Sequence, residues 1–521
     1  MKHIIPSASL VVLIAAGLGA GATPSPTLAD LAEHANSAGV LALVKKGIDV
    51  NQPQADGATA LHWAAHHNDV ALAKRLLASG AKPNTTNDYG VTPLFLAAIN
   101  GSVEMLDTLL TGGANANATR PAGETVLMSA VRSGNTAAVA RLLKGGANPN
   151  AAQLSKGQSA LHWAVAEGHV EIARTLIEAG ANIKLRSTAE YTPLMYAARQ
   201  GSVDMARLLL DKGDDLEAAA KDGSSPLLIA TVKGHTALST YLLERGARAD
   251  GDLKAAGYSP LMWAAATFEP IPMTYKGIDA DGEWGTFAGI PDRAAKLALI
   301  NLLIAKGANV NATSTRMLPE MNPQNGAGNR PPHMGATPYL IAAQSADAEV
   351  MQLLKSKGAD PLLTAKDGQT ALMAVCDGIL ENVTLVTEEK RLAAAQTALD
   401  HGVTLEAENE RGYRAMHVAA RAGFHEIIKF MLAKGADLNP VSQPFKGFGL
   451  GRYYLEGQSP LGLVEGTVDG IFYERPDTAV FLRTLGAKSI GKFSPHDYEN
   501  TSPEATDKKG VSNKPFVYPE Q

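Results

Sequence analysis

QSALHWAVAEGHVEIARTLIEAGANIK, residues 158–184, contains two short segments, 160–167 and 170–179, in which apolar residues recur at helical spacing. Gly168-His169 separates the two segments, and Gly180-Ala181-Asn182 follows them. Each segment is long enough for only about two to three helical turns. Two helices this short cannot bury their apolar stripes within one pair. The pair must therefore stack on neighbours of the same kind.

Such neighbours recur on both sides of this stretch. The opening Ser159-Ala160-Leu161 has counterparts at intervals of 33 or 34 residues, which begin at Thr59, Thr92, Thr125, Thr192, Ser225 and Ser259. Insertions spread the later openings, which begin at Thr337, Thr370, Arg414 and Ser459. A Gly-Ala pair closes most copies. Because the same opening and closing motifs recur at this period, the chain resembles the ankyrin-repeat family over residues 28–493.

The resemblance implies the fold class: an all-α ankyrin-repeat solenoid of about twelve stacked helix–turn–helix repeats with β-turn fingers. The recurring residues suit that architecture. Thr or Ser can cap the first helix, Pro fits its first turn, and Gly ends the second helix with a positive φ. Insert loops are expected in the C-terminal half, where the spacing of the openings is irregular.

The sequence predicts three regions. Residues 1–22 are a predicted signal peptide, residues 23–493 form the solenoid, and residues 494–521 are a polar tail expected to be disordered. Within the solenoid we expect an N-terminal capping repeat at 23–53, regular repeats at 54–252, repeats with insertions at 253–456 and a C-terminal capping repeat at 457–493.

The N-terminus has the pattern of a secretory signal. A short basic start precedes the apolar residues 7–22, which end in Ala20-Gly21-Ala22, a small-residue cleavage pattern. The alternatives are an uncleaved anchor and a buried first helix. Exported ankyrin arrays are unusual in eukaryotes, so the resemblance points to a Gram-negative bacterium. After cleavage of the signal the chain is expected to be exported to the periplasm or secreted, with no membrane span in the mature chain.

Composition excludes several classes of function. A net charge of -5 and a pI near 6.2 argue against a general nucleic-acid binder. Cys376 is the only cysteine, so the chain has no internal disulfide and no cysteine zinc site. We expect Cys376 to be a buried small hydrophobe.

Histidine and tryptophan recur at fixed repeat positions. We expect His62, His162 and His417, which follow Leu or Met in the openings, to bond neighbouring backbone or hydroxyl groups. Trp63, Trp163 and Trp263 stand one position later. We expect them to pack between repeats, and a recognition stripe is the alternative.

Metal and catalytic motifs are weak. A metal face on His62 and His66 is conceivable, but no glutamate follows His62 in the metalloprotease manner. Asp279, Asp281 and Glu283 lack the frame of an EF-hand. No phosphate-binding loop or nucleophile elbow is recognisable. We therefore expect no catalytic residue, no metal and no cofactor, and the chain is predicted not to be an enzyme.

The resemblance to ankyrin repeats implies a recognition surface on the concave face, made of the fingers and the exposed ends of the first helices. Inserts separate helices at 267–292, 377–388 and 466–476, and lengthen fingers at 316–335 and 440–458. They either bind a partner or brace the solenoid. The candidate partner-binding residues on these elements are His66, His67, Asn100, Arg132, Arg199, Gln200, Lys233, Tyr275, Trp284, Arg330, Arg421, Arg452, Tyr453 and Tyr454.

The predicted function is that of a monomeric, non-catalytic scaffold which binds an unidentified protein partner and no nucleic acid. The alternative is a small-ligand or metal-binding protein, less readily an enzyme, with a site around Trp284 and Tyr453. Convergence of Asp281, Arg330, His333 and Arg452 on one cavity with them would favour that alternative. A secreted effector that acts on a host protein would share the binding mechanism.

Overall fold

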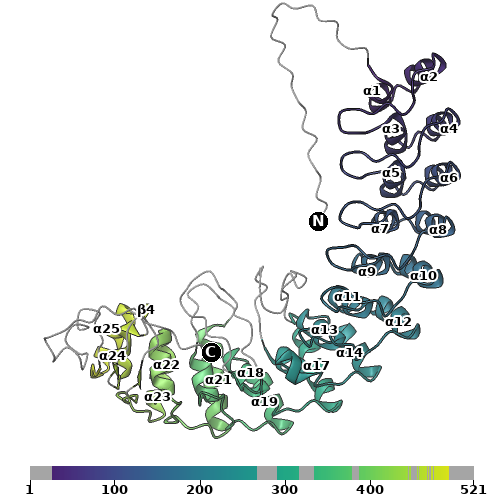
Figure 1. The fold of residues 1–521 in the computed structure, drawn as a ribbon. Coiled ribbons are helices and arrows are strands. Elements are labelled where there is room, and N and C mark those ends of the chain that lie inside the picture. The colour runs from purple at the N-terminus through teal and green to yellow at the C-terminus, as the bar shows by residue number, and fades with distance from the viewer. Residues whose placement is uncertain are drawn as a thin grey trace, which may run out of the picture. The chain divides into compact units, whose positions relative to one another are not determined.

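The computed structural model describes residues 26–266, 290–315, 334–377, 386–443, 457–465 and 475–491, together with four two-residue strands between 445 and 472. Its contacts divide the chain into two parts, Met1–Asn148 and Pro149–Gln521. The described residues form twelve helix pairs, four in the first part and eight in the second (Figure 1). The expected all-α solenoid is confirmed.

In the part Met1–Asn148, the pairs are α1 (Leu28–Glu33) with α2 (Ser37–Lys45), α3 (Ala60–His66) with α4 (Val70–Ala78), α5 (Pro93–Ile99) with α6 (Val103–Thr111), and α7 (Val126–Arg132) with α8 (Thr136–Lys144). Each first helix packs on the first helix of the next repeat, and the second helices form a parallel layer of their own. The apolar stripe of each short helix is thereby buried by its neighbours.

The part Pro149–Gln521 repeats this arrangement. Its pairs are α9 (Ala160–Ala166) with α10 (Val170–Glu178), α11 (Pro193–Gln200) with α12 (Val203–Asp211), α13 (Pro226–Val232) with α14 (Thr236–Glu244), α16 (Pro260–Ala265) with α17 (Arg293–Ala305), α18 (Pro338–Gln344) with α19 (Ala348–Ser356), α20 (Ala371–Cys376) with α21 (Glu388–Asp400), α22 (Ala415–Ala422) with α23 (His425–Ala433), and α24 (Pro460–Val464) with α25 (Pro476–Thr484).

A few elements depart from the helix-pair pattern. The short helix α15 (Leu253–Ala256) lies in the finger before α16. Two antiparallel hairpins flank α24: β1 (Phe445–Lys446) pairs with β2 (Tyr454–Leu455), and β3 (Thr467–Val468) pairs with β4 (Ile471–Phe472). The sequence predicted only loops at these positions, because a strand of two residues is too short to show the alternation of apolar and polar residues.

Side chains satisfy the free amides where the first helices begin. In α5 the hydroxyl of Thr92 accepts from the N–H of Phe95, and Pro93 occupies the first turn. In α3 a histidine makes the reciprocal bond, because His62 Nδ1 accepts from the N–H of the cap residue Thr59 at 3.1 Å. The other ring nitrogen, Nε2, therefore carries the proton and donates to the carbonyl of Val91 at 3.0 Å. The predicted structural role of His62 is confirmed.

Asparagine side chains join neighbouring repeats on the finger side. Asn84 donates from Nδ2 to the carbonyl of Gly113 at 2.9 Å, and its Oδ1 accepts from the N–H of Asn115 at 2.7 Å. We call this arrangement the asparagine ladder. Both bonds recur at Asn51, Asn117, Asn150 and Asn311. Glu217, Asp250, Glu406 and Asn439 make the accepting bond at the equivalent positions.

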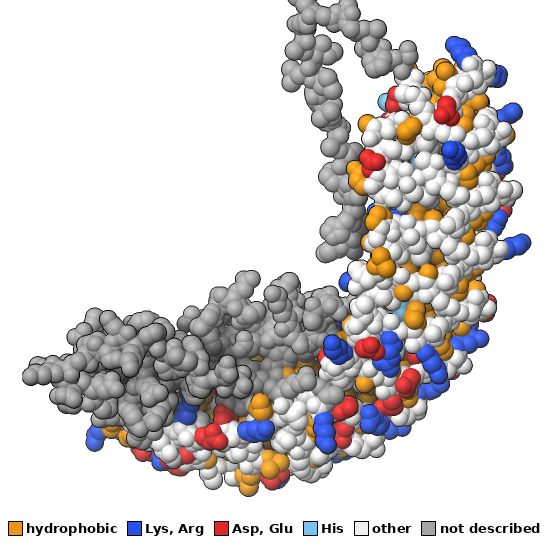
Figure 2. All heavy atoms as spheres, in the orientation of Figure 1, with side chains coloured by type: hydrophobic (Ala, Val, Ile, Leu, Met, Phe, Trp, Pro, Cys, Tyr) orange, Lys and Arg blue, Asp and Glu red, His pale blue; other side chains and the backbone are white. Residues whose placement is uncertain are grey.

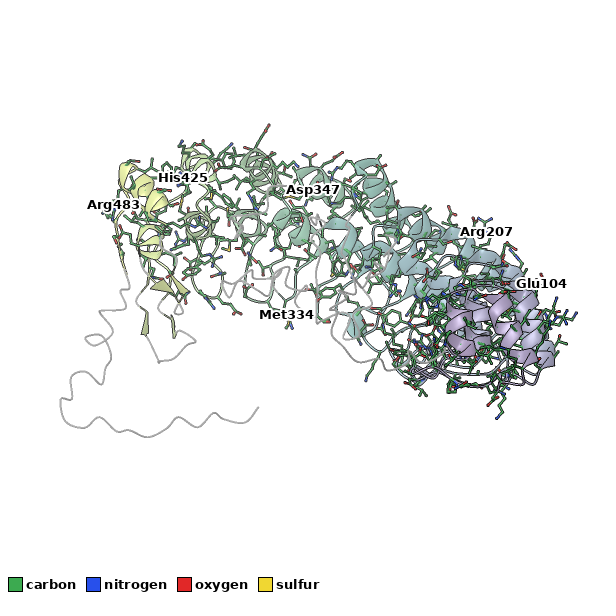
Figure 3. The ribbon with its side chains drawn as sticks, turned by 90° about the horizontal axis from the view of Figure 1, so that it is seen from above. Glu104, Arg207, Met334, Asp347, His425 and Arg483 are labelled. Carbon is green, nitrogen blue, oxygen red and sulfur yellow. The ribbon has the colours of Figure 1, made fainter. Side chains whose placement is uncertain are left out.

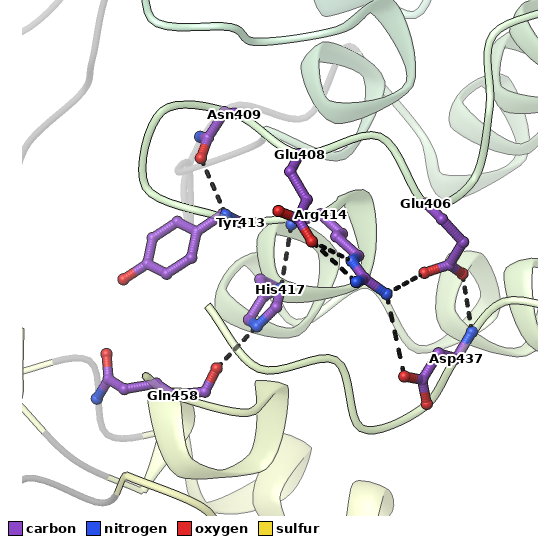
Figure 4. A network of polar contacts seen from close by, with 8 residues as sticks. All are labelled: Glu406, Glu408, Asn409, Tyr413, Arg414, His417, Asp437 and Gln458. Carbon is purple, nitrogen blue, oxygen red and sulfur yellow. Dashed lines mark hydrogen bonds and ion pairs between the residues drawn. The ribbon is translucent and has the colours of Figure 1, made fainter. Parts of the chain in front are cut away.

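An arginine pairs with Glu406, which is one of the accepting residues of the ladder. Arg414 stands where other openings have Thr or Ser, and its guanidinium pairs with Glu406 at 2.5 Å and with Glu408 at 2.8 Å (Figure 4). Glu406 also accepts from the N–H of Asp437 in the next repeat at 2.9 Å. One carboxylate thus serves both the ladder and the ion pair.

Lys184 interrupts the ladder, because an ammonium cannot accept a hydrogen bond. Elsewhere in the ladder, where no insert intervenes, the accepted N–H lies 31 or 32 residues after the accepting side chain. At Lys184 this spacing leaves the N–H of Asp215 without its usual acceptor. The preceding residue, Asp214, accepts this N–H at 2.8 Å and also accepts from the N–H of Leu194 at 3.1 Å. Asp214 is 7% exposed, and burial raises its pKa to about 6. Asp214 stands where most repeats have the alanine of the closing Gly-Ala pair. Its carboxylate therefore provides the acceptor that the ladder lacks at Lys184.

The substitution predicts coupling between positions 184 and 214. Asp214→Ala leaves two amides without an acceptor, which costs about 1–3 kcal/mol of unfolding free energy. Lys184→Asn should recover about 1 kcal/mol in the Asp214→Ala background and much less in the native chain, where the Asp215 amide is already satisfied. Urea unfolding of the native chain, both single variants and the double variant at pH 7 measures the coupling. Additive effects would contradict the role assigned to Asp214.

Candidate functional site

The C-terminal ends of the first helices are exposed in Met1–Asn148. His66 and His67 end α3, and Ile99 and Asn100 end α5, with Ile99 53% exposed. Arg132 ends α7 and is also exposed. Four of the predicted partner-binding residues, His66, His67, Asn100 and Arg132, therefore lie at the surface.

The equivalent positions in Pro149–Gln521 become progressively covered. Gln200 at the end of α11 is exposed, whereas Arg199 and Lys233 are half-buried. Arg421 in α22 is only 9% exposed. The predicted candidates on this part are thus unequal as contact residues, and Arg421 is the least accessible of those described.

The remaining candidates lie outside the described residues. These are Tyr275, Trp284, Arg330, Arg452 and Tyr453, together with the side chain of Tyr454. Asp281 and His333, named for the alternative ligand pocket, also lie outside them. The predicted roles of these inserted residues remain predictions.

A buried lysine fixes the base of the insert between α16 and α17. Lys296, the fourth residue of α17, is 3% exposed, and its ammonium donates to the carbonyl of Ala266 at 3.0 Å. It also pairs with Asp347 at 3.2 Å. Arg293 binds both carboxylate oxygens of Asp347 at 2.6 Å. Asp347, which caps α19 and is labelled in Figure 3, therefore ties the insert-bearing repeat to the next one.

A buried arginine occupies the same helix position in the next repeat with an interhelical insert. Arg391, the fourth residue of α21, donates to the carbonyl of Val375 at 2.6 Å and lies 4.6 Å over the ring of Phe424. Next to it, Asp377 accepts from Arg421 at 2.9 Å and from Gln369 at 3.2 Å. This pairing explains the burial of Arg421.

Arg391 replaces a backbone bond that an insert removes. In repeats without an insert, the residue that caps the second helix donates its N–H to a carbonyl near the end of the first helix, as Asp69 does to Ala64 at 2.8 Å. Val375 stands at the position of Ala64 relative to the helix cap. The insert moves the residue that caps the second helix away from this carbonyl, and the side chain of Arg391 donates to the carbonyl of Val375 in its place. We call Lys296 and Arg391 the insert clamps.

The buried groups are poor candidates for catalysis. Burial lowers the pKa of His162 and of His417 to about 4, and their Nδ1 atoms accept from the helix-capping amides of Ser159 and Arg414. Burial raises the pKa of the Cys376 thiol to about 12, which keeps it protonated. His62 is also a poor ligand for the metal site considered on His62 and His66, because both of its ring nitrogens form hydrogen bonds within the array.

Two searches of the described residues bear on other functions. Among them, no group of three or more His, Cys, Asp or Glu side chains is arranged to hold a metal ion. Within the same part of the chain, no helix has the length and apolar character that crossing a membrane requires.

Comparison with known proteins identifies the repeats. A family model described as "Ankyrin repeats (3 copies)" matches residues 28–120, 106–187, 127–219, 194–269 and 339–442, together more than half of the chain. Among curated proteins, B-cell lymphoma 3 protein homolog of Mus musculus is 31% identical over 109 residues, which are 20% of this chain and 22% of that protein. Human B-cell lymphoma 3 protein is 34% identical over 105 residues, with the same coverage.

The chain spans about a fifth of the length of these curated relatives. Among solved structures, the ankyrin repeat domain of human ASB11 is 30% identical and similar over 42% of this chain and 97% of that one, with a TM-score of 0.38.

The insert clamp predicts that Lys296→Met destabilises the array. The carbonyl of Ala266 loses its donor and Asp347 loses one of its two cations, so we expect a loss of about 1–3 kcal/mol in unfolding free energy. Lys306→Met, on the exposed cap of the same helix, is the matched control and should change stability by less than about 0.5 kcal/mol. Equal effects of the two substitutions in urea unfolding would contradict the clamp.

The buried histidines predict loss of stability on acidification. The unfolded chain binds protons near the ordinary histidine pKa of about 6.5, whereas folded His162 binds them only near 4. Stability is therefore lost as pH falls between these values, by about 2 kcal/mol at pH 5 for this residue. His162→Gln retains a capping partner for Ser159 and removes the titration. Its urea midpoint should fall less from pH 7 to pH 5 than that of the native chain, and an equal fall would contradict the prediction.

Proposed function

Because the chain belongs to the ankyrin-repeat family, whose repeats generally mediate protein–protein interaction, we propose that it is a non-catalytic scaffold that binds a partner protein. The proposed contact surface comprises the exposed ends of the first helices, the fingers and the insert loops. We further propose that the chain is monomeric and is exported to the periplasm after cleavage of residues 1–22.

One observation carries this proposal: framework groups are engaged within the array, while the residues at the ends of the first helices are exposed and vary in type. His62, His417 and the asparagines of the ladder bond neighbouring repeats, and the insert clamps bond the two helices of one repeat. The exposed ends of successive helices carry instead His66, Ile99, Arg132, Glu167 and Gln200. A fixed framework that presents changing chemistry suits recognition of one specific partner.

The clamps extend the proposal to the insert loops. Lys296 and Arg391 hold the helices on either side of two inserts through buried hydrogen bonds. An insert with a fixed base loses less entropy when it binds than one whose flanking helices also move. The loops are therefore suited to contact a partner rather than to maintain the fold.

The test is affinity capture from periplasmic extract of the source cells with residues 23–521 as bait. Two further baits carry changes: one lacks residues 267–289, and one carries Lys306→Met as the matched control. We expect one protein to be retained by the full bait and the control, and to be lost or reduced at least about tenfold with the deletion. The chain recovered from the same extract should begin at Thr23 by mass spectrometry.

Other outcomes would contradict parts of the proposal. Retention of the same protein by the deleted bait would assign the contact to the helix ends and fingers. Absence of any specific protein from all baits, with stabilisation of the chain by a metabolite or metal in thermal unfolding, would favour the ligand-binding alternative. A chain that is absent from the periplasm or retains residues 1–22 would contradict the proposed export.

A further inference from the structure

The first three repeats carry an aromatic surface that the framework does not use. Trp63 is half-buried in α3, where its ring stacks against His67 at 6.0 Å and meets His66 edge-on at 5.6 Å. Ile99, at the end of the adjacent helix α5, is 53% exposed. The side-chain amide of Asn100 donates to the carbonyl of His66 at 2.9 Å, which joins the two helix ends. We call Trp63, His66, His67 and Ile99 the Trp63 surface.

The Trp63 ring is held in place before any partner arrives. Its Nε1 donates to Oε1 of Gln54 at 2.7 Å. The amide of Gln54 in turn donates to Asp30 at 2.9 Å and to Glu33 at 2.6 Å. His67 Nε2 lies 2.9 Å from the carbonyl of Glu33. A side chain that is already fixed loses little rotamer entropy on binding, so this surface is pre-organised for contact.

Carboxylates lie on the elements that hold the Trp63 ring. Asp30 in the first turn of α1 and Glu33, the last residue of α1, both accept from Gln54, and Asp56 and Asp88 lie in adjacent fingers joined by a backbone bond of 2.9 Å. Among the described residues, no lysine or arginine forms an ion pair with any of these four carboxylates. Hydrogen bonding from Gln54 lowers the pKa of Asp30, which keeps this group charged.

The opposite side of the same repeats carries most of their lysine and arginine side chains. On the second helices, Lys74 pairs with Glu104 at 3.0 Å and Arg141 pairs with Asp107 at 2.7 Å. Figure 2 shows that the lysine and arginine side chains of the described residues of Met1–Asn148 project mainly from this side, whereas several acidic side chains lie toward the finger side. Carboxylates without an ion-pair partner among the described residues thus lie on the same side of the repeats as the half-buried Trp63 ring.

We propose that the Trp63 surface, with Glu33, Asp56 and Asp88 at its edge, binds a segment of a protein partner that carries arginine or lysine. This inference rests on the proposed function and specifies the chemistry of the partner. A guanidinium or ammonium group is attracted both by the indole ring and by the carboxylates. Ile99 provides apolar contact for the stem of the same side chain.

The experiment selects random peptides from a phage-displayed library on immobilised full-length chain and measures their affinities in solution. We expect the selected peptides to be enriched in arginine and lysine relative to the input library. The double variant Glu33→Lys/Asp88→Lys reverses two exposed charges at the edge and should weaken these peptides at least about tenfold. Glu104→Lys on α6 is the matched control and should change affinity less than about twofold.

A second pair of variants tests the aromatic contact. Trp63→Ala should weaken the basic peptides at least about fivefold, whereas Trp163→Ala, at the equivalent position of α9, should leave their affinity unchanged. Thermal unfolding of each variant checks that the array is intact. Should Trp63→Ala not fold, the exposed double variant still decides, because Glu33 and Asp88 are both at the surface.

The outcomes separate this inference from the proposed function. Peptides that bind but lack basic residues, or that respond equally to Glu104→Lys and to the double variant, would overturn the inference and leave protein binding standing. Selection of no binding peptide, together with failure of affinity capture, would overturn both.

Discussion

Every boundary between stacked repeats leaves backbone groups that must be satisfied, and the fold depends on how this is done. The asparagine ladder provides a donor and an acceptor from one short side chain, as Asn84 does for Gly113 and Asn115. A carboxylate at the same position, such as Asp250, can only accept. Asparagine is therefore the residue that satisfies both groups across a boundary, and each replacement shifts the task elsewhere.

Asp214 and the insert clamps follow the same constraint. Where Lys184 cannot accept, a neighbouring carboxylate is buried at the cost of a raised pKa. Where an insert removes a backbone bond, Arg391 supplies a side-chain donor. In each case a polar group that would be unsatisfied has acquired a partner, even though desolvation of the charge opposes it.

The sequence predicted the helix pairs well, because capping residues, prolines and closing glycines recur at a fixed period. It also predicted the structural role of His62 and the burial of Cys376. It did not predict the hairpins, whose strands are too short for a pattern. The buried pair of Arg421 with Asp377 was also missed, since these residues are 44 positions apart and only packing brings them together. The candidate surface was predicted by position, but the accessibility of each member depended on neighbours that no periodicity encodes.

The insert clamps also bear on how such an array can change. Each clamp needs one cation in the first turn of the second helix and one carbonyl at the end of the first, and neither depends on the length or composition of the chain between them. Residues can be inserted, deleted or substituted between the two helices while the hydrogen bonds of the clamp and of the stacked repeats are kept. The repeats with clamps are thus the places where this lineage could acquire new surface loops, and where a foreign loop could be grafted, without rebuilding the helices.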